Sequence, residues 1–142
     1  MGDPTGRSTG ADALIEALRL ERHPEGGWFR ETWRDPDVEG ARGSGTAIYF
    51  LLRAGERSHW HRVDAVEIWH HYAGDPLELA VGGDATVVLG PEVTEGQVPQ
   101  AIVPAGAWQS ARSLGAWTLV GCTVSPAFRF EGFELAPDGW SP

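Results

Sequence analysis

The order of apolar and polar residues along the chain predicts one helix followed by many short strands. Residues 11–22, ADALIEALRLER, place Leu14, Ile15 and Leu18 at helical spacing, and Pro24 ends this segment. Beyond it, short runs rich in β-branched and aromatic residues alternate with turn signals such as AGDP, GGD and VPAG. We expect strands in WFRETW, TAIYFLL, SHWHRV, EIWHHYA, LELAV, ATVVLG, QAIVPAG, WTLVGCTV and FRFEGFEL. Short strands joined by short turns are typical of an all-β barrel or sandwich.

The domain organisation follows from what lies between these elements. Residues 1–10, MGDPTGRSTG, are almost free of apolar side chains, so we expect a flexible tail without the apolar core of a secretory signal. No repeat or linker divides residues 11–142, which predicts a single domain. No apolar run approaches the roughly 18 residues that a membrane-spanning helix needs.

Charge and residue usage exclude several classes of function. The 11 basic and 20 acidic residues give a net charge of −9, so we expect no binding to nucleic acid or to an anionic membrane. All the basic residues are arginines, and without lysine neither Schiff-base chemistry nor lysine-anchored pyridoxal phosphate is available. The single cysteine, Cys122, forms no intrachain disulfide and lies in the apolar run LVGCTV. We therefore expect a buried thiol and a reducing, cytoplasmic location.

A cluster of histidines and a glutamate carries the candidate chemistry. Strand alternation predicts that His59 and His61 share one face, and a hairpin would return Glu67 beside them. Two histidines and one carboxylate are a ligand pattern for Fe, Mn, Ni or Zn. Without a metal, His61 and Glu67 would form a proton-transfer pair, with His61 as the general acid or base.

Aromatic residues supply candidates for a ligand pocket. The seven tryptophans indicate either ordinary core packing or an aromatic-walled cavity, and both readings stay open. If the face of WFRETW that carries Trp28 lines the pocket, Arg30 would receive an acidic group. Otherwise Arg30 is exposed and paired with a carboxylate. The HPEGG segment is interpreted as a structural turn, with His23 at the surface or at the helix end. The candidate ligand-binding residues are Trp28, Arg30, Tyr49, Trp69, Trp108 and Gln109.

The histidine segment also resembles a known motif. SHWHRVDAVEIWHHYAGDPLEL is similar to the first conserved motif of the cupin superfamily, and VPAGAWQ is similar to the second, with Gln109 where that motif has a histidine. The resemblance implies a metal site formed by His59, His61, Glu67 and Gln109. Three features of this chain depart from the pattern. The spacing from His61 to Glu67 is one residue longer than usual, no glycine stands six residues before His59, and Gln109 is a poor ligand.

Longer strings resemble one group within that superfamily. HPEGGWFRETWR, TAIYFLL, PQAIVPAGAWQSAR and LVGCTVSPAFRFEGFEL, together with the histidine segment, resemble the cupin_5 group from about Leu14 to Leu135. The resemblance implies a double-stranded antiparallel β barrel of the jelly-roll type with one N-terminal helix. It also implies a homodimer with a pocket inside each barrel. In this group the position of His61 is usually histidine, whereas that of His59 often is not.

Three functions remain open from the sequence, all with a small molecule as the partner. The first is a metal-independent isomerase, epimerase, lyase or cyclase that uses His61 and Glu67 on a sugar-like or secondary-metabolite intermediate. The second is an oxygenase or lyase that depends on one divalent metal. The third is a non-catalytic protein that binds a ligand.

Overall fold

The computed structural model describes residues 7–142, and their side chains from Gly10 onward. In chain order the elements are α1 (Arg7–Leu18), β1 (Glu21–Arg22), β2 (Trp28–Arg34), β3 (Thr46–Arg53), β4 (Arg57–Val63), β5 (Val66–Gly74), β6 (Leu77–Val81), β7 (Ala85–Leu89), η1 (Val93–Glu95), β8 (Gln100–Val103), β9 (Gln109–Ser113), β10 (Trp117–Ser125), η2 (Phe130–Gly132) and β11 (Phe133–Leu135).

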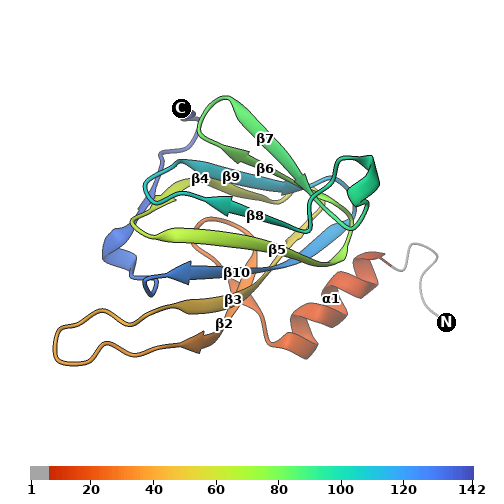
Figure 1. Cartoon of the computed structure of the whole chain (residues 1–142). Coiled ribbons are helices and arrows are strands. Elements are labelled where there is room, and N and C mark those ends of the chain that lie inside the picture. Colours follow the sequence, from red (N-terminus) through yellow and green to blue (C-terminus); the bar gives the residue numbers. More distant parts are fainter. Residues whose placement is uncertain (1–6) are drawn as a thin grey trace.

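Two antiparallel sheets face each other across the interior (Figure 1). One sheet has six strands in the order β1-β2-β3-β10-β5-β8, and the other has five in the order β11-β4-β9-β6-β7. Helix α1 lies outside the six-stranded sheet, against β3 and β10. The predicted jelly-roll architecture with one N-terminal helix is thus confirmed for the described residues, although the sheets form a sandwich and not a closed barrel.

The helix begins and ends four residues earlier than the sequence pattern predicts. It ends at Leu18 because Arg19 adopts a left-handed backbone conformation, and residues 21–22 then pair with β2 as a short strand. Residues 7–10 of the expected tail are helical, and residues 1–6 lie outside the described part of the chain. In the part of the chain that is described, no helix has the length and apolar character needed to cross a membrane.

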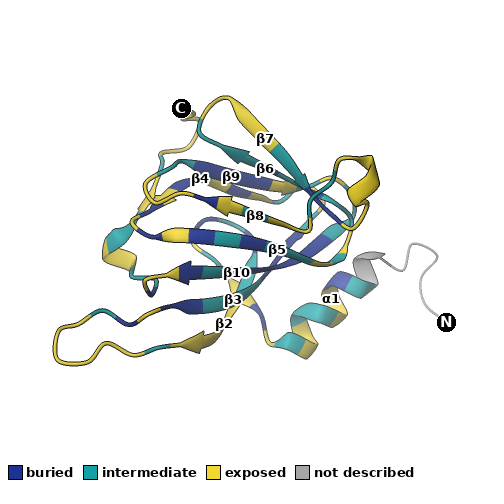
Figure 2. Ribbon diagram, in the orientation of Figure 1, coloured by how far each residue is buried: buried dark blue, intermediate teal, exposed yellow. Residues whose placement is uncertain are grey.

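The main apolar core lies between the two sheets, whose central strands carry most of the buried residues (Figure 2). Trp69, Phe50 and Leu79 are among its buried members, while Leu51 points the other way and packs beneath the helix. Alternation along β3 therefore sends neighbouring side chains to two different clusters. Beside this core, aromatic and polar side chains from both sheets surround a cavity.

Candidate functional site

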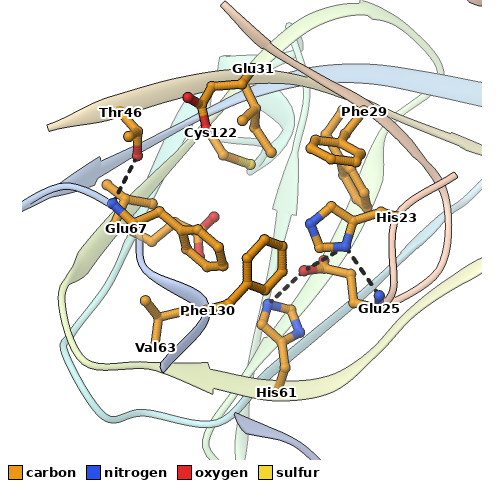
Figure 3. Close-up of a pocket in the computed structure, with 14 residues that line it drawn as sticks. His23, Glu25, Phe29, Glu31, Thr46, His61, Val63, Glu67, Cys122 and Phe130 are labelled. Atoms are coloured by element: carbon orange, nitrogen blue, oxygen red, sulfur yellow. Dashed lines mark hydrogen bonds and ion pairs between the residues drawn. The ribbon is translucent and has the colours of Figure 1, made fainter. Parts of the chain in front are cut away.

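The cavity lies between the two sheets and has a volume of about 50 Å³, enough for a few water molecules or a small ligand. Its walls are half apolar and half polar (Figure 3). The apolar lining residues are Phe29, Ile48, Phe50, Val63, Val124, Phe128 and Phe130. The polar ones are His23, Glu25, Glu31, Thr46, His61, Glu67 and Cys122.

His61 is buried in the cavity wall and held by the backbone of its own strand. Its Nδ1 lies 2.7 Å from the carbonyl oxygen of His59, and since a carbonyl oxygen only accepts, Nδ1 is the donor. Its Nε2 lies 3.4 Å from Oε1 of Glu25. Burial lowers the pKa of His61, although the charge of Glu67 acts in the opposite direction. The ring is therefore neutral near pH 7, with an unprotonated Nε2.

Glu25 reaches the cavity from the HPEGG turn. The turn packs against β4, where the amide of His59 donates to the Glu25 carbonyl at 2.8 Å. This approach requires glycine at residue 26, because a Cβ there would lie 2.0 Å from the carbonyl oxygen of Arg57. The hydroxyl of Ser58 donates to Oε2 of the buried Glu25 carboxyl. Burial raises the pKa of Glu25 to about 8, so this group is protonated near neutral pH.

Glu67 is the second buried carboxyl, and a chain of hydrogen bonds fixes its position. Nε2 of Gln109 donates to Oε1 of Glu67 at 2.9 Å, while Oε1 of Gln109 accepts from the indole N–H of Trp69 at 2.8 Å. Burial raises the pKa of Glu67 to about 7. Cys122 lies beside this carboxyl, and its own burial raises the pKa of the thiol. Glu67 therefore exchanges a proton in the physiological range.

The predicted metal-ligand set is not assembled. The same-face expectation for His59 and His61 was wrong, because a bulge between Ser58 and His61 turns the His59 side chain outward. The Gln109 oxygen accepts from an indole, so an N–H of that amide faces Glu67. Among residues 10–142 no three His, Cys, Asp or Glu side chains are grouped closely enough to hold an ion. These residues do not fit the two-histidine, one-carboxylate pattern.

The other predicted ligand-binding residues lie outside the cavity. Strand β2 points Phe29 and Glu31 inward, so the expectation for the Trp28 face was wrong. The Trp28 indole donates to Glu56 instead, and Arg30 is exposed and donates to the carbonyl of Leu18.

The remaining aromatic candidates contact other parts of the fold. Tyr49 packs in the cluster beneath the helix, since its neighbours on β3 face the cavity. Trp108 packs on Trp140 with ring centres 4.5 Å apart. Trp69 does not line the cavity but contacts two residues beside it, through its hydrogen bond to Gln109 and its edge-on packing against Phe50 at 5.8 Å.

Three titratable residues that line the cavity, His23, Glu25 and Glu31, were missed by sequence reasoning. His23 was expected at the surface, yet its side chain is only 7% exposed and its ring packs edge-on against Phe29 at 4.5 Å. Glu25 was treated as part of a structural turn. The signal in the sequence was the HPEGG string itself, which places two titratable side chains next to a turn rich in glycine. The turn brings Glu25 to within 3.4 Å of His61, and His23 lies 3.5 Å from the same Glu25 oxygen.

Comparisons with known proteins agree with this architecture. Residues 12–136 match the cupin_5 family, described as cupin superfamily (DUF985). A protein from Shewanella oneidensis is 39% identical, with a TM-score of 0.83 over 89% of this chain and 84% of that chain. A hypothetical protein from Leishmania major is 34% identical, with a TM-score of 0.81 over 89% of this chain and 86% of that chain.

More distant structures share the fold alone. The DMSP lyase DddQ from Ruegeria pomeroyi is 19% identical, with a TM-score of 0.63 over 92% of this chain and 68% of that chain. No protein of curated function shows a significant match. Because the family match spans nearly the whole domain, the chain belongs to the cupin_5 family of the cupin superfamily.

Proposed function

We propose that this cupin is a proton-transfer enzyme, an isomerase, epimerase or lyase, that acts on a small uncharged carbonyl compound in the cavity. One observation carries the proposal. A neutral His61 with an unprotonated Nε2 lies among two buried carboxyl groups with raised pKa values, in a cavity whose walls are half apolar. Groups with pKa values shifted toward neutrality are suited to general acid–base catalysis.

The roles follow from the protonation states. His61 Nε2 takes the proton from the carbon next to a carbonyl, so a C–H bond breaks and an N–H bond forms. The electron pair makes the C=C bond of an enol, and the carbonyl oxygen takes the proton of Glu67. In an isomerisation, the Glu67 carboxylate then accepts the proton of the neighbouring hydroxyl, and His61 returns its proton to the other carbon. No oxidant or reductant is consumed.

In this mechanism Glu25 stabilises the charge that forms on His61. Its Oε1 lies 3.4 Å from Nε2 and its Oε2 accepts from Ser58, so the carboxyl stays close to the imidazole that gains charge during the reaction. Ionisation of Glu25 would stabilise the imidazolium.

The charges of the lining residues also limit which substrates the cavity can bind. Of the residues that the structure describes, no arginine lines the cavity, and the sequence contains no lysine. Glu31, at the cavity wall, is paired with Arg34 at 2.8 Å, so that arginine is engaged. A phosphorylated or carboxylated substrate would lack a cationic partner and would face carboxyl groups, which favours uncharged compounds.

Proton exchange with solvent tests this function whatever the final product is. The protein is incubated in D₂O with dihydroxyacetone, erythrulose, xylulose and cyclohexane-1,2-dione, and loss of the α-proton signal is followed by ¹H NMR. We expect exchange above the buffer rate for at least one compound, and a loss of about 10²–10⁴-fold in His61→Ala and Glu67→Gln. His70→Gln removes a histidine outside the cavity and serves as the matched control. Exchange that persists in His61→Ala would contradict the proposal.

A further inference from the structure

The HPEGG turn places a second imidazole, that of His23, at the cavity. A hydrogen bond from the turn determines which nitrogen of this ring carries the proton. The backbone N–H of Glu25 donates to Nδ1 of His23 at 3.1 Å. A backbone amide is always a donor, so Nδ1 of His23 must be the unprotonated nitrogen. The proton of the neutral ring is therefore on Nε2, the opposite arrangement from His61, whose proton is on Nδ1.

The Nε2–H of His23 has no acceptor among the residues that the structure describes. Among the described side chains, Nε1 of Trp117 is the one fully buried nitrogen or oxygen atom that lacks a hydrogen-bond partner. Nε2 of His23 also lacks a partner but is not one of these fully buried atoms, so it is accessible. The His23 side chain lines the cavity. A fixed donor that points into a small cavity is available to a ligand oxygen.

The surroundings keep this ring rigid and neutral. Phe29, Phe50 and Phe133 pack edge-on against it, with ring centres 4.5, 5.8 and 6.3 Å away. Burial and the nearby His61 lower the pKa of His23 to about 4, so it stays uncharged in the physiological range. Figure 3 shows His23 and His61 on either side of the Glu25 carboxyl. Nδ1 of His23 lies 3.5 Å and Nε2 of His61 3.4 Å from Oε1 of Glu25.

Given the proposed proton-transfer function, on which this inference rests, we propose that His23 is a further catalytic residue that donates a hydrogen bond from Nε2 to the substrate's carbonyl oxygen. The two imidazoles then act in opposite senses: His61 accepts the α-proton, and His23 stabilises the negative charge that develops on the oxygen. Preorganised donors of this type stabilise the transition state more than the ground state. A neutral imidazole in this role polarises the carbonyl without giving up its proton.

The position of the proton is tested first, in the unaltered protein. Long-range ¹H–¹⁵N NMR of the ¹⁵N-labelled chain at pH 7.5 reports which nitrogen of each ring carries a proton, with signals assigned from His23→Gln and His61→Gln. We expect His23 to be protonated at Nε2 alone and His61 at Nδ1 alone. A His23 ring protonated at Nδ1, or at both nitrogens, would overturn the inference whatever the activity.

The catalytic role is tested in the D₂O exchange assay on any compound that the wild-type protein exchanges. His23→Phe removes the donor and should lower kcat about 10²–10³-fold with a smaller change in KM, the loss expected for one such donor. His23→Gln carries an amide N–H at nearly the position of Nε2 and should stay within about tenfold of wild type. Equal activity of His23→Phe and wild type, or equal loss in both variants, would refute the role.

The two proposals fail in different ways. Exchange that needs His61 but not His23 overturns the role of His23 and leaves the proposed function in place. No exchange by the wild-type protein with any compound of the panel overturns the proposed function, and the role of His23 with it. Circular dichroism of each variant separates a lost donor from a lost fold.

Discussion

The free energy of unfolding should fall as the pH rises from 6.5 to 8, and Glu25 should account for most of the fall. Burial raises the pKa of Glu25 to about 8, from an ordinary value of 4.5. Between these values the folded protein holds a proton on Glu25 that the unfolded chain has released. Stability from this group is thus complete below pH 4.5 and is lost as the pH rises through about 8. We expect Glu25→Gln, which mimics the protonated carboxyl, to remove this dependence.

The magnitude follows from the same values. Each pH unit over which one proton is lost on unfolding changes the free energy of unfolding by about 1.4 kcal/mol. From pH 6.5 to 8, Glu25 contributes a loss of about 2 kcal/mol. Glu67, with a pKa raised to about 7, contributes a loss of up to roughly 1 kcal/mol in the lower part of this range. Below pH 6.5 the buried His23, with a pKa near 4, gives the opposite slope, because only the unfolded chain takes up its proton.

Urea denaturation at half-unit steps from pH 6.5 to 8, followed by tryptophan fluorescence, measures this slope. The wild-type protein should lose about 2–3 kcal/mol over the range, and Glu25→Gln about 1 kcal/mol or less. Asp64→Asn is the control: a hydrogen bond from Arg42 holds the pKa of Asp64 below its usual range, so its carboxyl is ionised throughout. A constant or rising wild-type stability, or a Glu25→Gln variant with the wild-type slope, would refute the assignment of a protonated Glu25.

Three further substitutions check other parts of the site. His59→Ala should keep exchange activity within about threefold of wild type, because the ring faces outward, whereas His61→Ala should lose at least about 10²-fold. Gln109→Leu should lower the free energy of unfolding by about 2–4 kcal/mol in urea titrations, since it leaves the buried indole N–H of Trp69 without an acceptor and removes one hydrogen bond from the buried carboxyl of Glu67. Gly26→Ala should lower the thermal midpoint by several degrees in calorimetry, because its Cβ would clash with the Arg57 carbonyl. An unchanged midpoint would show that the turn can move.

The strands were predictable because turn signals separate them and because their apolar residues alternate. Strand β9 was missed: its sequence, QSARS, has polar side chains at positions that are buried in the structure. Gln109 and Ser110 are buried there because each finds a hydrogen-bond partner inside the fold. A strand whose buried side chains are polar and hydrogen-bonded has no regular alternation of apolar residues. A search for that alternation therefore cannot find such a strand.

The site was predictable only where local sequence determines it. His61 and Glu67 lie on consecutive strands, but β4 and β5 belong to opposite sheets, so the expected hairpin was wrong. A short connection between the two sheets brings both side chains to one cavity. Glu25 joins them through contacts with residues more than 30 positions away, which depend on the close approach of the glycine turn to β4. His59 was misplaced because a single extra residue in a strand reverses every later side chain, and strict alternation cannot anticipate a bulge.

Main-chain groups determine which nitrogen of each imidazole carries the proton. The carbonyl of residue 59 holds the proton on Nδ1 of His61, and the amide of residue 25 keeps Nδ1 of His23 unprotonated. Any residue other than proline at 59 supplies the same carbonyl without altering the strand pairing. In the proposed mechanism the backbone at position 59 is needed and its side chain is not, whereas at positions 23 and 61 the imidazole itself is required.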